Sequence, residues 1–149
     1  MMPSDWLVDT NILVQVCRAS PLGRHVIEER QLRAREQTPL ISVVTVGEMF
    51  ALARKFGWAE PKRAYMHEIL ADLVIVDINR EAILEKYAEI DAWCHAQGIK
   101  PGKNDLWIAA TASLTGATLL TTDKDFDPFH KVFLTREYFD PHGQYGADR

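Results

Sequence analysis

The sequence predicts a single domain with a three-layer α/β fold around a mainly parallel sheet of four to five strands. Short apolar runs typical of buried parallel strands recur along the chain, and helical patterns of apolar residues separate them. Parallel neighbours require a crossover element, and right-handed crossovers cover both faces of a sheet. A length of 149 residues without a linker or an internal repeat fits one domain.

Five apolar segments are the candidate strands. The predicted strands are Trp6–Val8, Leu40–Val44, Leu73–Ile78, Thr118–Leu120 and a weaker Val132–Leu134. Each gap between the first four is longer than the dozen or so residues that a parallel crossover needs. The spacing therefore agrees with helices that connect parallel strands.

Four helices are predicted between the first and third strands, over Ile12–Ala19, Pro21–Gln37, Thr45–Phe56 and Pro61 to about Leu70. The second has a clear start, because Ser20 followed by Pro21 combines an N-cap with a first-position proline. The third ends before Gly57, a residue type common at helix C-termini. The third and fourth helices should form a hairpin between the second and third strands.

Two further helices are predicted in the second half of the chain. Asn79 is the expected N-cap of a longer helix that ends at Gly98. Its apolar stripe recurs at three- and four-residue steps and consists of Ile83, Tyr87, Ile90 and Cys94. Asn104 is the expected cap of the next helix, which runs from Asp105 to about Leu114 and stops at Gly116.

The last residues of the chain have no regular periodicity. Glu137–Arg149 contains Pro141, Gly143 and Gly146, which disfavour a helix or a strand. We therefore expect residues 1–136 to form the domain and residues 137–149 to be a flexible tail, ordered only by a partner.

Composition and charge narrow the function classes. Seventeen basic and 21 acidic residues give a net charge of −4, so any binding to nucleic acid must be local. The 5 histidines and 2 cysteines lack metal-ligand spacing, and the sequence contains no motif for a dinucleotide, ATP or α/β-hydrolase site. No signal-like or membrane-spanning run is visible, and Cys17 and Cys94 lie on apolar helix patterns. We expect a soluble, cytoplasmic protein.

Four acids lie where the carboxyl ends of the predicted strands meet. Asp9 and Asp123 follow the first and fourth strands. Glu48 lies in the first turns of the helix after the second strand, and Asp105 opens the helix before the fourth. Neighbouring carboxylates repel, and a hard cation such as Mg²⁺ or Mn²⁺ relieves that repulsion and supports phosphodiester hydrolysis. The short polar residues that can hold waters or orient ligands there are Thr10, Asn11 and Thr122.

Each acid also has a local explanation. Thr45 and Glu48 have the spacing of a capping box, in which the glutamate side chain only returns to the helix start. Asp105 can complement a helix dipole, Asp9 can cap a helix, and Asp123 can be a turn residue. Each explanation suffices for one residue, but none accounts for four acids at one sheet edge.

The chain resembles the PIN-domain ribonucleases and, within them, the VapC-type toxins of bacterial toxin–antitoxin pairs. The resemblance covers Trp6 to Arg136 and rests on the order and spacing of four segments. They are Leu7-Val8-Asp9-Thr10-Asn11, Glu48 after Ser42–Val46, Asn104–Ala112 and Leu120–Phe126. It implies a PIN-like fold in which the catalytic, metal-binding acids are Asp9, Glu48, Asp105 and Asp123. It also implies that Asp125 can share or support the role of the fourth acid.

The same resemblance implies a function and partners. It implies a Mg²⁺- or Mn²⁺-dependent endoribonuclease that cleaves RNA, forms a homodimer and is bound by an antitoxin protein. The helical hairpin is the expected antitoxin groove, because it has more apolar residues than one core face requires: Met49, Phe50, Leu52, Phe56 and Trp58. Lys100 and Lys103 precede Asp105 and are the candidates for contact with RNA phosphates.

Two other functions remain as alternatives. One is a PIN-like scaffold that binds RNA or a protein partner without cleavage, for which the loss of acids is the expected sign. The other is an aspartyl-phosphate phosphotransferase, because an aspartate after the first strand can be a nucleophile. Such enzymes use Asp-x-Asp, whereas Asn11 occupies the third position here.

Overall fold

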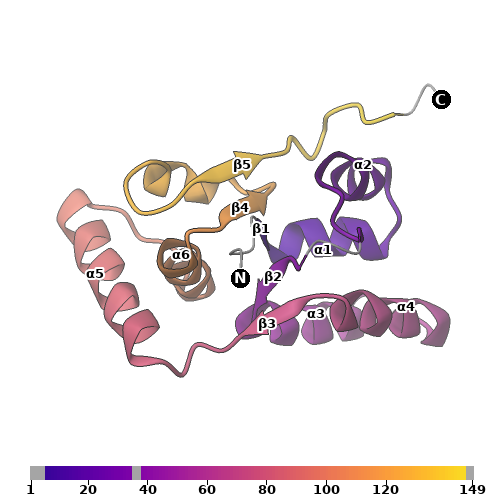
Figure 1. Cartoon of the computed structure of the whole chain (residues 1–149), viewed down its shortest axis with the longest axis horizontal. Helices are drawn as coiled ribbons and strands as arrows, with labels where there is room; N and C mark the ends of the chain where they lie inside the picture. The colour runs from indigo at the N-terminus through magenta and orange to yellow at the C-terminus, as the bar shows by residue number, and fades with distance from the viewer. Residues whose placement is uncertain (1–5, 35–37, 147–149) are drawn as a thin grey trace.

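The computed structural model describes residues 6–34 and 38–146 (Figure 1). Its five strands form one sheet in which all neighbouring pairs run parallel. The strands are β1 (Trp6–Val8), β2 (Leu40–Ser42), β3 (Val74–Val76), β4 (Thr118–Thr121) and β5 (Arg136–Tyr138), in the spatial order β3-β2-β1-β4-β5. The strand order reverses between β1 and β4, which is where ligands bind in open α/β sheets.

Helices cover both faces of the sheet (Figure 1). They are α1 (Thr10–Cys17), α2 (Pro21–Arg30), α3 (Val43–Lys55), α4 (Glu60–Ala71), α5 (Glu81–Gln97), α6 (Lys103–Thr115) and the short 3₁₀ helix η1 (Lys124–Phe129). Helices α1 to α4 pack on one face, and α5, α6 and η1 pack on the other. The predicted three-layer fold with a parallel sheet is confirmed. None of the helices in the described ranges is long and apolar enough to cross a membrane.

Alternate residues of the central strands enter two separate cores. Leu7 and Leu119 pack with α5, α6 and η1, whereas Val8 and Leu120 pack with α1 to α4. All four side chains are at most 1% exposed, as expected for strands covered on both faces. Because side chains alternate along a strand, the residue after Val8 turns back toward the α6 side. That residue is Asp9.

The second strand is shorter than predicted. Ser42 is the N-cap of α3, and its hydroxyl accepts a hydrogen bond from the backbone N–H of Val44 at 3.1 Å. Helix α3 therefore begins at Val43 instead of Thr45, and the strand ends at Ser42 instead of Val44. A capping hydroxyl at the end of the strand outweighs the β-propensity of the two valines that follow.

Other helix ends also differ from prediction. Helix α1 begins at Thr10, two residues early, and α2 ends at Arg30, where Gln31 has a φ of 50°. The remainder of the expected second helix lies in residues 31–34, which form a turn, and in residues 35–37, outside the described residues. The N-cap positions of α5 and α6 belong to Arg80 and Gly102, not to Asn79 and Asn104, and neither cap residue makes a side-chain hydrogen bond.

The three predicted glycine stops are confirmed, and Gly57, with a φ of 63°, follows the C-cap Phe56 of α3. Gly98 and Gly116 follow α5 and α6, and each has a φ of 73°, a conformation that glycine adopts without steric cost. Gly116 is followed within two residues by β4, so this turn directs the chain from α6 back into the sheet.

The fifth strand and the C-terminal segment differ most from the prediction. Val132–Leu134 is a turn after η1, and the strand instead covers Arg136–Tyr138. This strand pairs with β4 at the sheet edge and is half-buried, so it needs no apolar run. Phe139 follows it into the core beside α2, and Tyr145 contacts the His25 ring at 4.8 Å between centroids. The expected domain boundary at residue 136 therefore falls inside β5, and Phe139 belongs to the core. Residues 147–149 of the expected tail lie outside the described residues.

Candidate active site

Asp9 is the most buried acid at the carboxyl edge of the sheet. It is 3% exposed, and its carboxylate accepts hydrogen bonds from the backbone N–H of Thr10 at 2.8 Å and the Thr121 hydroxyl at 2.7 Å. Burial raises the pKa of Asp9 to about 7, the two hydrogen bonds oppose the rise, and the charges of Asp105 and Asp123 add to it. Asp9 is the N-cap of α1, as its position in the sequence suggests. Its carboxylate also interacts electrostatically with Asp105 and Asp123.

Thr10 connects α1 to Glu48 on α3. Its Oγ1 lies 2.7 Å from Glu48 Oε1 and 3.2 Å from Thr45 Oγ1. Because a hydroxyl carries one proton, Thr10 can donate to the carboxylate and accept from Thr45. Thr45 lies inside α3, which Ser42 caps, so the capping-box explanation of Glu48 is wrong. The Glu48 carboxylate is instead directed toward α1 and the sheet edge.

Three further carboxylates form a compact group. Asp105 lies in the first turn of α6, Asp123 follows β4, and Asp125 lies in η1. Each offers an oxygen atom, and these atoms all lie within 4.8 Å of one another. Burial raises the pKa of Asp105 to about 6, and the charges of Asp123, Asp125 and Glu48 raise it further. Asp105 therefore interacts electrostatically with each of the other four acids at this edge.

Thr121 joins the buried acid to the compact group. Its hydroxyl donates to Asp9 Oδ2 and accepts the backbone N–H of Asp123 at 2.9 Å. Asp123 in turn caps η1, and its Oδ1 accepts the N–H of Asp125 at 2.8 Å. One continuous hydrogen-bonded path from the end of β4 thus includes the carboxylates of Asp9 and Asp123 and the backbone N–H of Asp125.

The donor set fits a hard divalent cation. The groups are carboxylate oxygens, the preferred ligands of such ions. Within residues 6–34 and 38–146, none of these five acids forms an ion pair with a lysine or an arginine. Like charges without basic partners explain the raised pKa values in part, and a bound cation would relieve that repulsion. Asp105, Asp123 and Asp125 are the residues best placed to hold it.

The remaining predicted site residues lie at the rim. Asn11 is exposed in the first turn of α1, and Thr122 is half-buried between β4 and Asp123. Lys100 and Lys103 are exposed around the start of α6, and neither forms an ion pair with a described residue. These four residues are close to the acids in the sequence, but within the described ranges their side chains form no hydrogen bond or ion pair with them.

Sequence reasoning missed Thr121, the threonine that holds Asp9, and predicted a site role for the neighbouring Thr122 instead. Thr121 is 0% exposed, and Thr45, which the sequence suggests only as a helix cap, is 1% exposed and contacts Thr10. The available signal was a threonine at the end of the apolar run Leu119–Leu120, because a hydroxyl in a buried strand needs a hydrogen-bond partner. Which partner it meets depends on the pairing of β1 with β4, which the sequence does not display.

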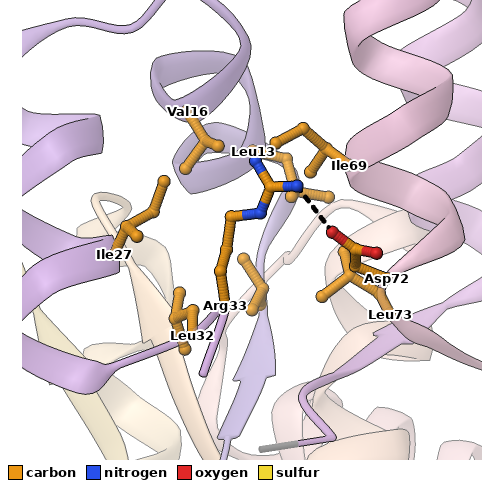
Figure 2. Close-up of a pocket in the computed structure, with 9 residues that line it drawn as sticks. Leu13, Val16, Ile27, Leu32, Arg33, Ile69, Asp72 and Leu73 are labelled. Carbon is orange, nitrogen blue, oxygen red and sulfur yellow. Dashed lines mark hydrogen bonds and ion pairs between the residues drawn. The ribbon is translucent and has the colours of Figure 1, made fainter. Parts of the chain in front are cut away.

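A small cavity lies on the α1–α4 face of the sheet and carries no comparable chemistry (Figure 2). It has a volume of about 20 Å³, room for about one water molecule, and most of its lining residues are apolar, among them Leu13 of α1, Ile27 of α2 and Ile69 of α4. Arg33 and Asp72 lie at its mouth and form an ion pair with 2.7 Å between Nη2 and Oδ2. Its polar groups are already paired, so the acids at the sheet edge remain the candidate site.

Comparisons with known proteins show the family of the chain. A family model described as PIN domain matches residues 6–131. Ribonuclease VapC2 from Haemophilus influenzae is 28% identical over 131 residues, or 88% of this chain and 94% of that protein. Ribonuclease VapC2 from Rickettsia felis is 27% identical, over 87% of this chain and 95% of that protein. The chain is also similar to the crystal structure of VapBC2 from Rickettsia felis bound to a DNA fragment from its promoter, with a TM-score of 0.78 and 25% sequence identity. The matched region is 91% of this chain and 98% of the chain in that structure.

Proposed function

Because the chain belongs to the PIN domain family, we propose that it is a Mg²⁺- or Mn²⁺-dependent endoribonuclease and the toxin of a toxin–antitoxin pair. The observation that carries the proposal is the convergence of five acids, without basic partners among the described residues, on the edge where the strand order reverses. They are Asp9, Glu48, Asp105, Asp123 and Asp125. The relatives named Ribonuclease VapC2 support RNA as the substrate.

The residues have different roles in this proposal. Asp105, Asp123 and Asp125 would hold the ion, with Asp9 behind them. When bound, such an ion lowers the pKa of water and offsets the charge that develops on a phosphate. Asp9 is fixed by Thr121, so its carboxylate needs no reorganisation. Glu48 Oε1 accepts from Thr10, which leaves Oε2 as the candidate acceptor for a proton from the attacking water.

An antitoxin is the proposed protein partner, at the α3–α4 hairpin. Met49 and Trp58 are buried in the core, whereas Phe50 and Phe56 are 43% and 47% exposed. A groove beside Phe50 continues along the hairpin and is lined by Ala53, Arg54, Arg63, Met66 and His67. Its combination of apolar side chains and arginines fits an amphipathic antitoxin segment with acidic residues. Hydrogen exchange should slow in α3 and α4 when the antitoxin binds, and unchanged exchange there would contradict this location.

A second copy of the chain is the other proposed partner. Val74 and Ile75 on the edge strand β3 are 45% and 50% exposed, so apolar surface remains beyond the hairpin. Analytical ultracentrifugation of the purified protein should give the mass of a dimer. An RNA substrate and the free thiols of Cys17 and Cys94 are both consistent with a cytoplasmic location.

The test of the proposed activity uses the purified chain and a pool of short single-stranded RNAs. We expect cleavage with Mg²⁺ or Mn²⁺, none with EDTA, and none with the Asp105→Asn variant. Antitoxin should inhibit cleavage by the wild-type protein. RNA binding without cleavage under all metal conditions would favour the scaffold function, and a phosphorylated protein after incubation with a phosphate donor would favour the phosphotransferase.

A further inference from the structure

Lys124 has an unusual environment for a lysine between two acids of the site. It separates Asp123 from Asp125 in the sequence, yet it forms no ion pair with any described acid. Its Nζ instead lies over the ring of Tyr138, 5.7 Å from the ring centroid. A cation over an aromatic face is held by the ring quadrupole while its N–H groups stay available to another ligand.

The ring that holds Lys124 is fixed beside the acids by the sheet. Tyr138 on β5 is in register with Thr121 on β4, the residue that holds Asp9. Registered residues of parallel strands have their side chains on the same face, so the Tyr138 ring lies on the face that carries the acids. Arg136 also pairs with Asp127 at 3.0 Å, which ties β5 to η1.

We propose that Lys124, held over Tyr138, binds a phosphate of the RNA backbone next to the phosphodiester that is cleaved. This inference rests on the proposed ribonuclease function. Five acids and a net charge of −4 repel RNA, so a backbone phosphate needs a local cation at the site. Lys124 is such a cation, and its orientation by Tyr138 keeps its charge from being neutralised by the acids. Tyr138 is then a positioning residue.

A purely electrostatic role would have different consequences. If Lys124 only offsets the charge of the acids, its removal should strengthen metal binding and lower the Mn²⁺ concentration needed for half-maximal cleavage. A phosphate contact predicts the opposite pattern: an unchanged Mn²⁺ midpoint and weaker RNA binding. The two roles are therefore separable by measurement.

The first experiment measures RNA binding with cleavage blocked. The affinity of the Asp9→Asn protein for a short single-stranded RNA is measured in EDTA as a function of salt, with and without Lys124→Gln. We expect about fivefold weaker binding and a slope of log affinity against log salt that is smaller by about 0.7, the value for one phosphate on a single strand. Lys124→Arg should restore both.

Lys55→Gln is the matched control, because Lys55 is exposed at the end of α3, about 10 Å along the helix from Glu48. It removes the same charge and should leave the salt slope unchanged. An equal change in both variants, or no change in Lys124→Gln, would overturn the phosphate contact.

The second experiment measures cleavage in the otherwise wild-type protein. Lys124→Gln should raise KM about fivefold with kcat within about twofold, because a contact to a neighbouring phosphate binds substrate and transition state alike. Tyr138→Leu should raise KM by a smaller factor, and Tyr138→Phe should behave as wild type. A shifted Mn²⁺ midpoint or a fall in kcat alone would contradict the proposal. If the wild-type chain itself cleaves no RNA, the proposed function fails, whatever Lys124 does.

Discussion

Charged residues are arranged in opposite ways in two regions of this molecule. At the carboxyl edge of the sheet, five acids face one another without a basic partner among the described residues. On the α1–α4 face, Arg33 pairs with Asp72 at the mouth of an apolar cavity (Figure 2), and Arg30 pairs with Glu137. The paired charges connect elements that are distant in the sequence, whereas burial and the neighbouring unpaired acids raise the pKa of Asp9 and Asp105. We therefore assign the paired charges to the stability of the fold and the unpaired acids to the proposed site.

The largest expected effect is that of Asp9→Asn. The variant removes one metal-binding charge with little change in volume, so cleavage should fall by about a thousandfold or more. Its stability should not fall, because a neutral side chain suits a site where burial raises the pKa of Asp9 to about 7. Cleavage rates with Mn²⁺ and thermal unfolding of the metal-free protein test both parts. Full activity would remove Asp9 from the mechanism.

The pH dependence of stability sharpens the same contrast. A carboxyl whose pKa rises on folding stabilises the folded state only while it is protonated, so this contribution is lost as the pH rises from about 4 to above 7. The metal-free wild type and Asp9→Asn should be equally stable below about pH 4. Above pH 8, Asp9→Asn should be more stable by about 4 kcal/mol, the equivalent of three pKa units.

Urea unfolding in EDTA across this pH range measures that difference between the two proteins. Mg²⁺ or Mn²⁺ should reduce it, because the ion stabilises the ionised wild-type site. A difference that stays constant with pH would show that Asp9 does not titrate in this range.

Glu48→Gln tests a smaller effect at the same edge. The amide oxygen can still accept the Thr10 hydroxyl, so stability should change by less than about 1 kcal/mol. Cleavage should fall by about a hundredfold, because the charge that a hard cation or a proton prefers is lost. Unfolding without metal and cleavage against Mn²⁺ concentration measure the two effects. A destabilised variant with normal turnover would leave Glu48 a structural role only.

The smallest effect is expected on the other face. Arg33→Met keeps an apolar stem against the cavity and removes the ion pair with Asp72, whose side chain is 49% exposed. The free energy of unfolding should change by less than about 1 kcal/mol, and cleavage should be unchanged. Urea unfolding and the cleavage assay apply here as well. A loss of cleavage activity in this variant would show that the proposed site depends on the Arg33–Asp72 ion pair, which would contradict the separation of the two regions.

Much of the fold could be predicted because parallel strands and glycine stops leave local signals. Trp6–Val8 was predicted at its observed bounds, and Gly98 and Gly116 end their helices as expected. The N-termini of α5 and α6 were less predictable, because Arg80 and Gly102 occupy the cap positions without a side-chain hydrogen bond and so leave no cap signal in the sequence. The edge strand Arg136–Tyr138 escaped detection because an edge position does not require apolar residues.

The candidate site, too, could be predicted only in part from the sequence. Asp9 and Asp123 could be selected because they follow strands, and Asp105 because it opens a helix. The sequence could not show that Thr121 holds Asp9 or that Thr10 holds Glu48, since both contacts depend on which strands and helices become neighbours. Residue types are local information, but their hydrogen-bond partners are set by topology.

The separation between Asp9 and Thr121 has a consequence for biosynthesis. The two residues that share the buried hydrogen bond are 112 positions apart, and the ribosome adds Asp9 long before Thr121. A nascent chain that ends before β4 has Asp9 and Glu48 but lacks Thr121, Asp123 and Asp125. For the ribonuclease proposed above, the five acids can assemble only after β4 and η1 have been synthesised, so a shorter nascent chain lacks part of the proposed site.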